Sequence, residues 1–178
     1  GHQDIFIANG HIYPNAHVVD HTTTYEQTNQ LFRNVGGGVF ENASAAVGLT
    51  ALASSRGAAV SDYDLDGDLD IVVTNSNGAA RLLRNDGGNA SGWIQLAPPA
   101  TSAIGTRVEI VTGDVTQTVT IKAGQGYMSQ SSLVAHFGIG DATVVDEARV
   151  TFADGSVVVM RDLVPNRRVV VVPNGEER

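Results

Sequence analysis

Five aspartates stand at every second position between Asp62 and Asp70, in the run Asp-Tyr-Asp-Leu-Asp-Gly-Asp-Leu-Asp. So many carboxylates in one short segment repel one another unless a cation holds them together. Oxygen-only ligands with several negative charges suit calcium, which takes six to eight oxygens. Magnesium fits less well because it prefers octahedral geometry and retains its waters. The spacing therefore predicts a calcium (Ca²⁺) loop rather than a solvated acidic turn.

The predicted calcium ligands are four side chains and one backbone carbonyl. A loop that turns its first, third and fifth side chains toward one ion must bend sharply, and Gly67 has the conformational freedom for that bend. The expected ligand set consists of the carboxylates of Asp62, Asp64, Asp66 and Asp70 and the backbone carbonyl of Asp68.

The elements that must position this loop are short strands. β-Branched runs between turn signals recur along the chain, and helical periodicity is nearly absent, which predicts an all-β fold. Glycines at 36–38 and the pair Asn77-Gly78 indicate two hairpins in the first half. The strands predicted there cover residues 4–8, 31–34, 39–42, 58–60, 71–75 and 80–85, with a long polar loop at residues 11–27.

The composition changes at residues 86–92, Asp-Gly-Gly-Asn-Ala-Ser-Gly, a stretch without periodic apolar residues that is typical of a linker. We place a domain boundary near residue 90, which divides the chain into residues 1–90 and 91–178. Apolar and polar residues alternate beyond it, as at Val108 and Ile110, which favours a small antiparallel β-sandwich or barrel. The strands predicted there cover residues 93–96, 107–111, 116–122, 148–152, 157–160 and 168–172.

Composition narrows the class of protein. The chain has 178 residues, 42% of them hydrophobic, and a formal net charge of −8, which argues against a nucleic-acid partner. It has no cysteine, so disulfides and thiolate metal sites are excluded, and no apolar run long enough for a membrane span. The first residues lack the pattern of a signal peptide and lead directly into strand-like sequence, so we expect a fragment of a longer protein.

Two strings in the first half, NQLFRNVGGGVFENAS and SRGAAVSDYDLDGDLDIVVTNSNGAARLLRN, resemble FG-GAP/VCBS repeats. The resemblance implies propeller-type blades with a calcium loop between two strands of a blade, although this chain has sequence for one or two blades only. Four strings in the second half, AIGTRVEIVTG, KAGQGYMSQSS, HFGIGDA and VTFADGSVVVM, resemble the ASPIC/UnbV domain. That domain follows such repeats in secreted proteins.

Other candidate sites have plainer explanations. Four histidines and Asp20 lie near the start without a zinc-ligand spacing, so a surface loop is the better interpretation. Gly124-Gln125-Gly126 is followed by no helix that would bind phosphate, which favours a structural turn. A catalytic group of Ser129, Ser131, Ser132, His136 and Asp141 lacks the Gly-x-Ser-x-Gly context. We expect Asp146 and Glu147 to face solvent, and Asn42 and Asn89, both in glycosylation-type triplets, to be turn residues.

These features predict a non-catalytic, calcium-stabilised β module outside the cytoplasm, in the periplasm, on the cell surface or secreted. It would present a rigid surface to a protein or glycan partner, or dock as an accessory subunit in a larger assembly. The alternative is the C-terminal part of a propeller enzyme whose active site lies mostly outside these residues.

Overall fold

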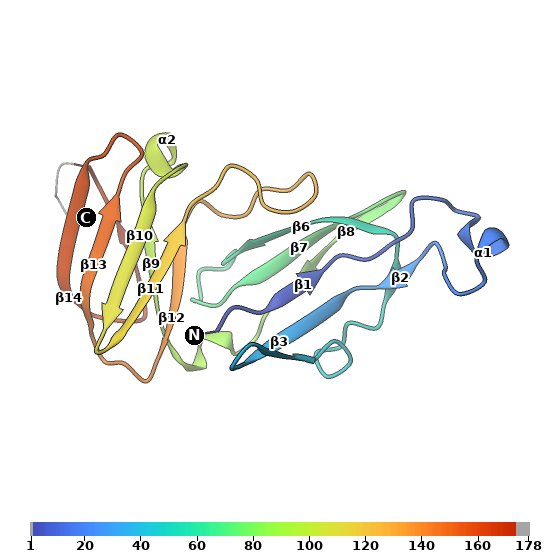
Figure 1. Ribbon diagram of the computed structural model, residues 1–178, viewed down its shortest axis with the longest axis horizontal. Coiled ribbons are helices and arrows are strands. Elements are labelled where there is room, and N and C mark those ends of the chain that lie inside the picture. Colours follow the sequence, from blue (N-terminus) through green and yellow to red (C-terminus); the bar gives the residue numbers. More distant parts are fainter. Residues whose placement is uncertain (1, 174–178) are drawn as a thin grey trace.

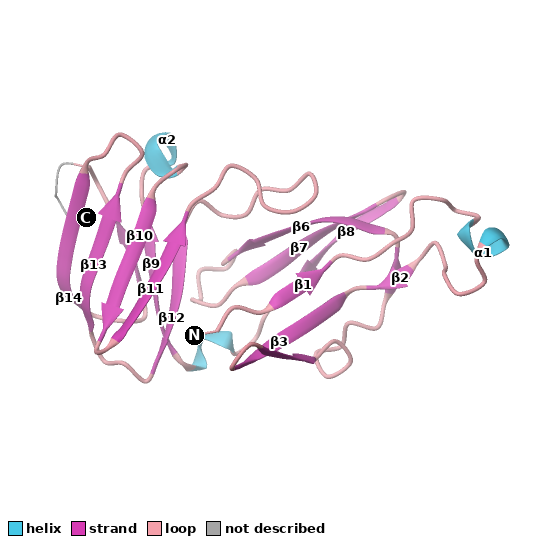
Figure 2. Cartoon of the chain, in the orientation of Figure 1, coloured by secondary structure: helices cyan, strands magenta, loops and turns pink. Residues whose placement is uncertain are grey.

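Strands make up nearly all of the regular structure in the computed structural model, which describes residues 2–173 (Figure 2). The helical elements are short: α1 (Ala16–Val19), α2 (Ala100–Ala103) and the 3-10 turn η1 (Gly88–Ala90). The predicted all-β class is confirmed. Figure 1 shows an N-terminal segment (residues 2–83) at one end of the molecule and a C-terminal sandwich (residues 92–171) at the other, joined by a connecting segment at residues 84–91.

The N-terminal segment contains two three-stranded sheets and one two-stranded sheet. The first has the order β1-β3-β4 and the second the order β6-β7-β8, each formed by antiparallel neighbours. Both predicted hairpins are confirmed, since β3 pairs with β4 and β7 pairs with β8. The strands are β1 (Ile5–Ile7), β2 (Gln27–Thr28), β3 (Gln30–Gly36), β4 (Val39–Asn42), β5 (Leu52–Ala53), β6 (Ser55–Ser61), β7 (Asp70–Asn75) and β8 (Gly78–Leu83).

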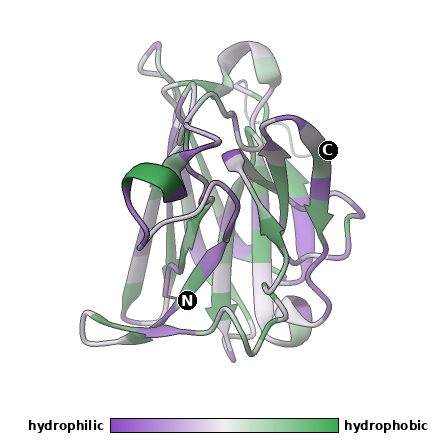
Figure 3. Ribbon diagram, turned by 90° about the vertical axis from the view of Figure 1, so that its right-hand side faces the viewer, coloured by the Kyte–Doolittle hydropathy of each residue, from purple (hydrophilic) through white to green (hydrophobic). Residues whose placement is uncertain are grey.

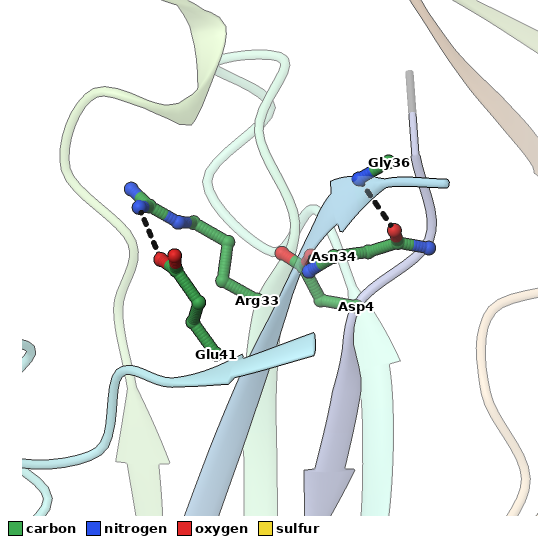
Figure 4. Close-up of polar contacts among 5 residues, drawn as sticks. All are labelled: Asp4, Arg33, Asn34, Gly36 and Glu41. Carbon is green, nitrogen blue, oxygen red and sulfur yellow. Dashed lines mark hydrogen bonds and ion pairs between the residues drawn. The ribbon is translucent and has the colours of Figure 1, made fainter. Parts of the chain in front are cut away.

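Polar contacts fix the turn of the first hairpin, as Figure 4 shows. Asp4 Oδ1 accepts from the backbone N–H of Asn34 at 2.8 Å, and Asn34 Oδ1 accepts from the N–H of Gly36 at 3.0 Å. Gly36 has a φ of +92°, which glycine adopts without steric cost. Arg33 and Glu41 pair across the strands at 3.0 Å, but both are exposed, so this ion pair adds little stability.

The C-terminal sandwich consists of two sheets, with strand orders β11-β10-β13-β14 and β12-β9-β15. All neighbours are antiparallel except β15 and β9, which run parallel. The predicted antiparallel sandwich thus contains one parallel pair, formed between its first and last strands. The strands are β9 (Gly92–Ala97), β10 (Arg107–Thr112), β11 (Val115–Thr120), β12 (Ala135–Gly140), β13 (Val145–Thr151), β14 (Val157–Leu163) and β15 (Arg167–Val170).

Strand β12 was absent from the strands predicted by the sequence. Its alternation is clear in the structure, because Ala135, Phe137 and Ile139 are buried while His136 and Gly138 face the other side. The two glycines of the strand resemble turn residues and hide this alternation. Its period-2 pattern was the available signal.

The hydrophobic core lies in the C-terminal sandwich. All eighteen members of the core cluster fall between Ile94 and Val171. The buried apolar residues of the N-terminal segment are Ala16, Ala53 and Val73. Figure 3 views the molecule from the side of α1, which is green because of its valines, and Val19 there is 92% exposed. The N-terminal segment therefore has little core of its own.

Within residues 2–173, no helix has the length and hydropathy needed to cross a membrane.

Candidate metal centre

The acidic loop connects β6 to β7. The two strands pair antiparallel, and Ser61 opposite Asp70 is the last pair before the loop at residues 62–69. Asp62 therefore directly follows β6, and Asp70 is the first residue of β7. Because the sheet fixes both ends of the loop, the first and last aspartates of the run lie close together at the end of the hairpin.

Three of the five aspartates come together. Asp62, Asp64 and Asp70 each offer one carboxylate oxygen, and these oxygens lie within 4.8 Å of one another. Asp70 is 2% exposed, whereas Asp64 is exposed. Three carboxylates this close repel each other, and a hard cation would remove that repulsion. The cluster could hold a metal ion.

Backbone amides hold the loop in this shape. Asp62 accepts from the N–H groups of Asp66 and Gly67, each at 3.1 Å, and Asp70 Oδ2 accepts from the N–H of Tyr63 at 3.1 Å. Gly67 has a φ of +99°, the conformation expected for the sharp bend. These hydrogen bonds hold the carboxylates of the loop close together before any ion binds.

Asp66 and Asp68 lie outside the three-carboxylate cluster. Asp66 Oδ1 accepts from the N–H of Asp68 at 3.1 Å. Asp68 turns toward the connecting segment, where its Oδ2 accepts from the amides of Gly87 and Gly88 at 3.2 and 3.0 Å. Burial raises the pKa of Asp68, although these two amides act in the opposite direction. The proposed roles of the Asp66 side chain and the Asp68 carbonyl as ligands stay predictions.

The donor set fits the predicted cation. Every side-chain donor in the cluster is a carboxylate oxygen, the type that calcium prefers. Asp68 Oδ1 is buried and has no hydrogen-bond partner among residues 2–173, so an unsatisfied acceptor remains in the acidic loop. The carboxylates of Asp62, Asp64 and Asp70 would hold the ion. When bound, the ion would supply charge neutralisation.

Residues of the C-terminal sandwich border the loop, and sequence reasoning did not find them. Gln95 Nε2 donates to Asp62 Oδ2 at 2.7 Å and lies 3.5 Å from His136 Nδ1. Trp93 stacks on His136, with ring centroids 6.2 Å apart and an interplanar angle of 12°. Burial lowers the pKa of His136, and the negative charge of Asp62 partly opposes this shift.

The lowered pKa of His136 predicts a pH-dependent stability. Unfolded His136 takes up a proton as the pH falls through about 6.5, whereas the folded imidazole stays neutral to a lower pH. The contribution of neutral His136 to the free energy of unfolding is therefore fully present above about pH 6.5, and it is lost as the pH falls toward the lower pKa of the folded state. We expect His136→Gln to flatten this decline in thermal unfolding measured from pH 7.5 to 5.5 in saturating calcium. His17→Gln, in exposed α1, is the control, and an unchanged slope in His136→Gln would contradict the assignment.

The other candidate groups are not assembled as sites. Among the described residues, the aspartate cluster is the one group of metal-ligating side chains that comes together, so the N-terminal histidines form no zinc site there. Ser131 and Ser132 bond to Val60 of β6, whereas His136 contacts Gln95. The two serines and His136 thus have different hydrogen-bond partners.

The remaining polar residues have structural partners. Glu147 pairs with Arg149 and Arg161, each at 3.1 Å, and Asp146 accepts from the N–H of Gly113 at 2.7 Å. Asn42 Oδ1 accepts from the N–H of Ser44 at 3.0 Å. Gly124 and Gly126 both have positive φ and lie in the loop between β11 and β12, as expected for a structural turn.

The chain is similar in sequence to cartilage acidic protein 1 of three vertebrates. Cartilage acidic protein 1 of Homo sapiens is 30% identical over 144 residues, which cover 73% of this chain and 21% of that protein. The Mus musculus protein is 29% identical over 143 residues, which cover 73% of this chain and 22% of the relative. The Xenopus tropicalis protein is 32% identical over 111 residues, which cover 57% of this chain and 16% of that protein. The chain thus aligns with about a fifth of the length of the two mammalian relatives.

Two family models match in succession. Residues 1–73 match the FG-GAP-like repeat, and residues 97–178 match the family described as ASPIC and UnbV. The first match contains β6, the acidic loop and most of β7, and the second contains most of the sandwich. The chain therefore consists of an FG-GAP-like repeat segment followed by an ASPIC/UnbV domain.

Proposed function

We propose that this chain is a non-catalytic, calcium-stabilised β module that acts outside the cytoplasm and docks onto a protein or glycan partner. The calcium part rests on the cluster of Asp62, Asp64 and Asp70 at the end of a β-hairpin. A location outside the cytoplasm agrees with a calcium loop of moderate affinity, because calcium is abundant there. The relatives' name, cartilage acidic protein, describes no enzymatic reaction.

The docking part rests on the surface of the N-terminal segment. Its strands expose large apolar side chains: Ile5 is 45% exposed, Val72 42% and Leu82 46%. Apolar residues spread over the faces of small sheets favour contact with another protein surface. Strand β8 is also an edge strand of its sheet, and no other strand of the described residues pairs with its outer edge. That edge can therefore pair with a strand of a partner. We propose that a larger assembly covers these faces, and that the boundary near residue 90 divides the docking segment from the sandwich.

The enzyme alternative has less support. It would gain from a polar site joining His11 and Tyr13 to the acidic loop. Instead, the backbone carbonyl of His11 accepts from Ser54 Oγ at 3.0 Å and from Arg56 at 2.8 Å. These are structural contacts of the loop before β2.

Calcium removal tests the proposal. We expect a chelator to lower the melting temperature of the N-terminal segment, because an ion that binds the folded state alone stabilises it by about 2.7 kcal/mol at a hundredfold excess over its Kd. Asp64→Asn should remove most of this calcium response. In chelator, the same variant should melt at or slightly above the wild-type temperature. It relieves repulsion within the cluster, and the exposed Asp64 side chain accepts no hydrogen bond from the described residues.

The matched control is Asp141→Asn, which removes one negative charge from an exposed turn of the sandwich. It should keep the full calcium response. Thermal unfolding in calcium and in chelator gives the melting temperatures of the wild type, Asp64→Asn and Asp141→Asn. An Asp64→Asn protein with the wild-type calcium shift would refute the site, and a wild type that melts equally in both conditions would refute calcium stabilisation altogether.

A further inference from the structure

The acidic loop binds the connecting segment as well as its own hairpin. The backbone N–H of Asn85 donates to Asp70 Oδ1 at 2.9 Å, and Asn89 Nδ2 donates to the carbonyl of Asp66 at 2.9 Å. The two glycine amides that donate to Asp68 also belong to this segment. Three aspartates of the run thus hold residues 85–89. The stretch that composition marked as a linker follows the surface of the loop.

Gln95 extends these contacts into the C-terminal sandwich. It lies on β9 between Ile94 and Leu96, which are fully buried in the sandwich core, so its own side chain points out of the opposite face. Gln95 is nevertheless only 2% exposed. On that face it donates to Asp62, a member of the three-carboxylate cluster, at 2.7 Å. One potential metal ligand is therefore positioned by a residue of the other half of the chain.

Trp93 packs on the bend of the loop. A Cβ placed on Gly67 would lie 2.0 Å from Trp93 Cε2 and 2.1 Å from Cζ2, so the indole occupies the space above this glycine. Trp93 and Gln95 are two residues apart on β9 and share its outer face. The glycine of the loop therefore serves two purposes: it allows the positive φ of the bend, and it lets the sandwich approach the backbone closely.

A second contact joins the two halves at β6. The loop between β11 and β12 extends from the sandwich toward β6 (Figure 1). There the N–H of Ser132 donates to the carbonyl of Val60 at 2.9 Å, and the N–H of Val60 donates to Ser131 Oγ at 3.1 Å. Because β6 is an edge strand, this loop covers part of a free sheet edge. Two separate contacts thus set the sandwich against the hairpin that carries the aspartates.

We propose that ion binding by the acidic loop and docking of the C-terminal sandwich are coupled, with Gln95 as a positioning residue for Asp62. This inference rests on the proposed calcium site. An ion that draws Asp62, Asp64 and Asp70 together fixes the same carboxylates that hold Gln95 and Asn85. By reciprocity, the docked sandwich then raises the affinity of the loop for the ion. The ion stabilises the joint between the two halves as well as the hairpin.

Tryptic cleavage of the intact wild-type chain tests this coupling directly. The peptide bond between Arg84 and Asn85 lies in the connecting segment. The N–H of this bond donates to Asp70 Oδ1. The Arg84 side chain is 54% exposed, so trypsin reaches it once the backbone is released. We expect calcium to slow cleavage at this bond and a chelator to speed it by at least several-fold, measured by mass spectrometry of the fragments 1–84 and 85–178.

Gln95→Leu tests the positioning role. Loss of one hydrogen bond to a charged group should weaken calcium binding about tenfold, measured by isothermal titration calorimetry. The control Gln117→Leu removes a hydrogen bond from Gln117 Nε2 to the carbonyl of Gly138, within the sandwich, and should leave the calcium affinity unchanged. Trp93 is the only tryptophan of the chain, so its fluorescence should respond to calcium in the wild type.

The outcomes separate the two proposals. If the wild type binds calcium and is stabilised by it, but cleavage after Arg84 ignores the ion, the coupling is refuted and the calcium site stands. Wild-type affinity in Gln95→Leu refutes the positioning role in the same way. A wild type that binds no calcium refutes both. If Gln95→Leu does not fold, Asn89→Ala removes the partly exposed contact to the Asp66 carbonyl instead, and it should speed cleavage in calcium.

Discussion

Residues 92–178 are expected to fold when they are expressed alone, whereas residues 2–91 expressed alone are expected to remain largely unfolded, even in calcium. The reason is the distribution of buried apolar surface. All eighteen members of the core cluster belong to the sandwich. A fully buried Val, Leu, Ile or Phe side chain contributes about 1.5–3 kcal/mol. The sandwich therefore has the hydrophobic stabilisation of an independent domain.

The N-terminal segment lacks that source of stability. Its three buried apolar residues are two alanines and Val73. Ordering the backbone costs about 1–2 kcal/mol per residue, and calcium adds back only a few kcal/mol at ordinary excess. The segment thus depends on the sandwich, and on whatever covers its exposed apolar faces in the proposed assembly.

Circular dichroism and amide NMR spectra of the two fragments measure this difference, with the complete chain as the reference. The sandwich fragment should show dispersed amide signals and a cooperative thermal transition. Dispersed signals and cooperative melting in residues 2–91 alone would contradict the prediction. They would show that the small sheets are sufficient without the contacts from β9 and from the loop between β11 and β12.

Local patterns allowed much of the fold to be predicted. The glycine triplet at residues 36–38 and the pair Asn77-Gly78 located the hairpins of β3–β4 and β7–β8. Period-2 alternation placed Val108 and Ile110 in the core, where both are fully buried. These features depend on neighbours close in the chain. The parallel pairing of β15 with β9 was not predictable in this way, since it joins strands more than seventy residues apart.

In the candidate site, too, contacts between residues near in sequence were predictable and contacts between distant residues were not. The spacing of the aspartates was enough to locate the loop, because its turn brings together residues that are near in sequence. Gln95 gave no signal, since a polar residue at an alternating strand position normally faces solvent. In the structure it is buried, and it donates to Asp62 of the acidic loop, which lies more than thirty residues earlier in the chain. The contact of Ser131 and Ser132 with β6 was hidden for the same reason: the partner, Val60, lies some seventy residues earlier.

The aspartates of the cluster differ in their burial and in the hydrogen bonds that they accept without an ion. Asp64 is exposed, whereas Asp70 is 2% exposed and accepts two backbone N–H groups, from Tyr63 at 3.1 Å and from Asn85 at 2.9 Å. One of these bonds closes the acidic loop and the other holds the connecting segment. Asp70 is therefore a structural residue of the hairpin as well as a potential ligand.

Asp70→Ala should consequently destabilise the N-terminal segment by about 2–4 kcal/mol in chelator, because two amides lose their acceptor, with part of the loss offset by relief of repulsion from Asp62 and Asp64. Asp64→Asn should show no such loss in chelator, although both variants lose the calcium response. Urea unfolding with and without calcium measures the difference. Asp70→Asn retains one carbonyl acceptor and should fall between the two. If Asp70→Ala and Asp64→Asn unfold at the same urea concentration in chelator, the amide bonds of Asp70 contribute nothing, and the hairpin depends on the ion alone.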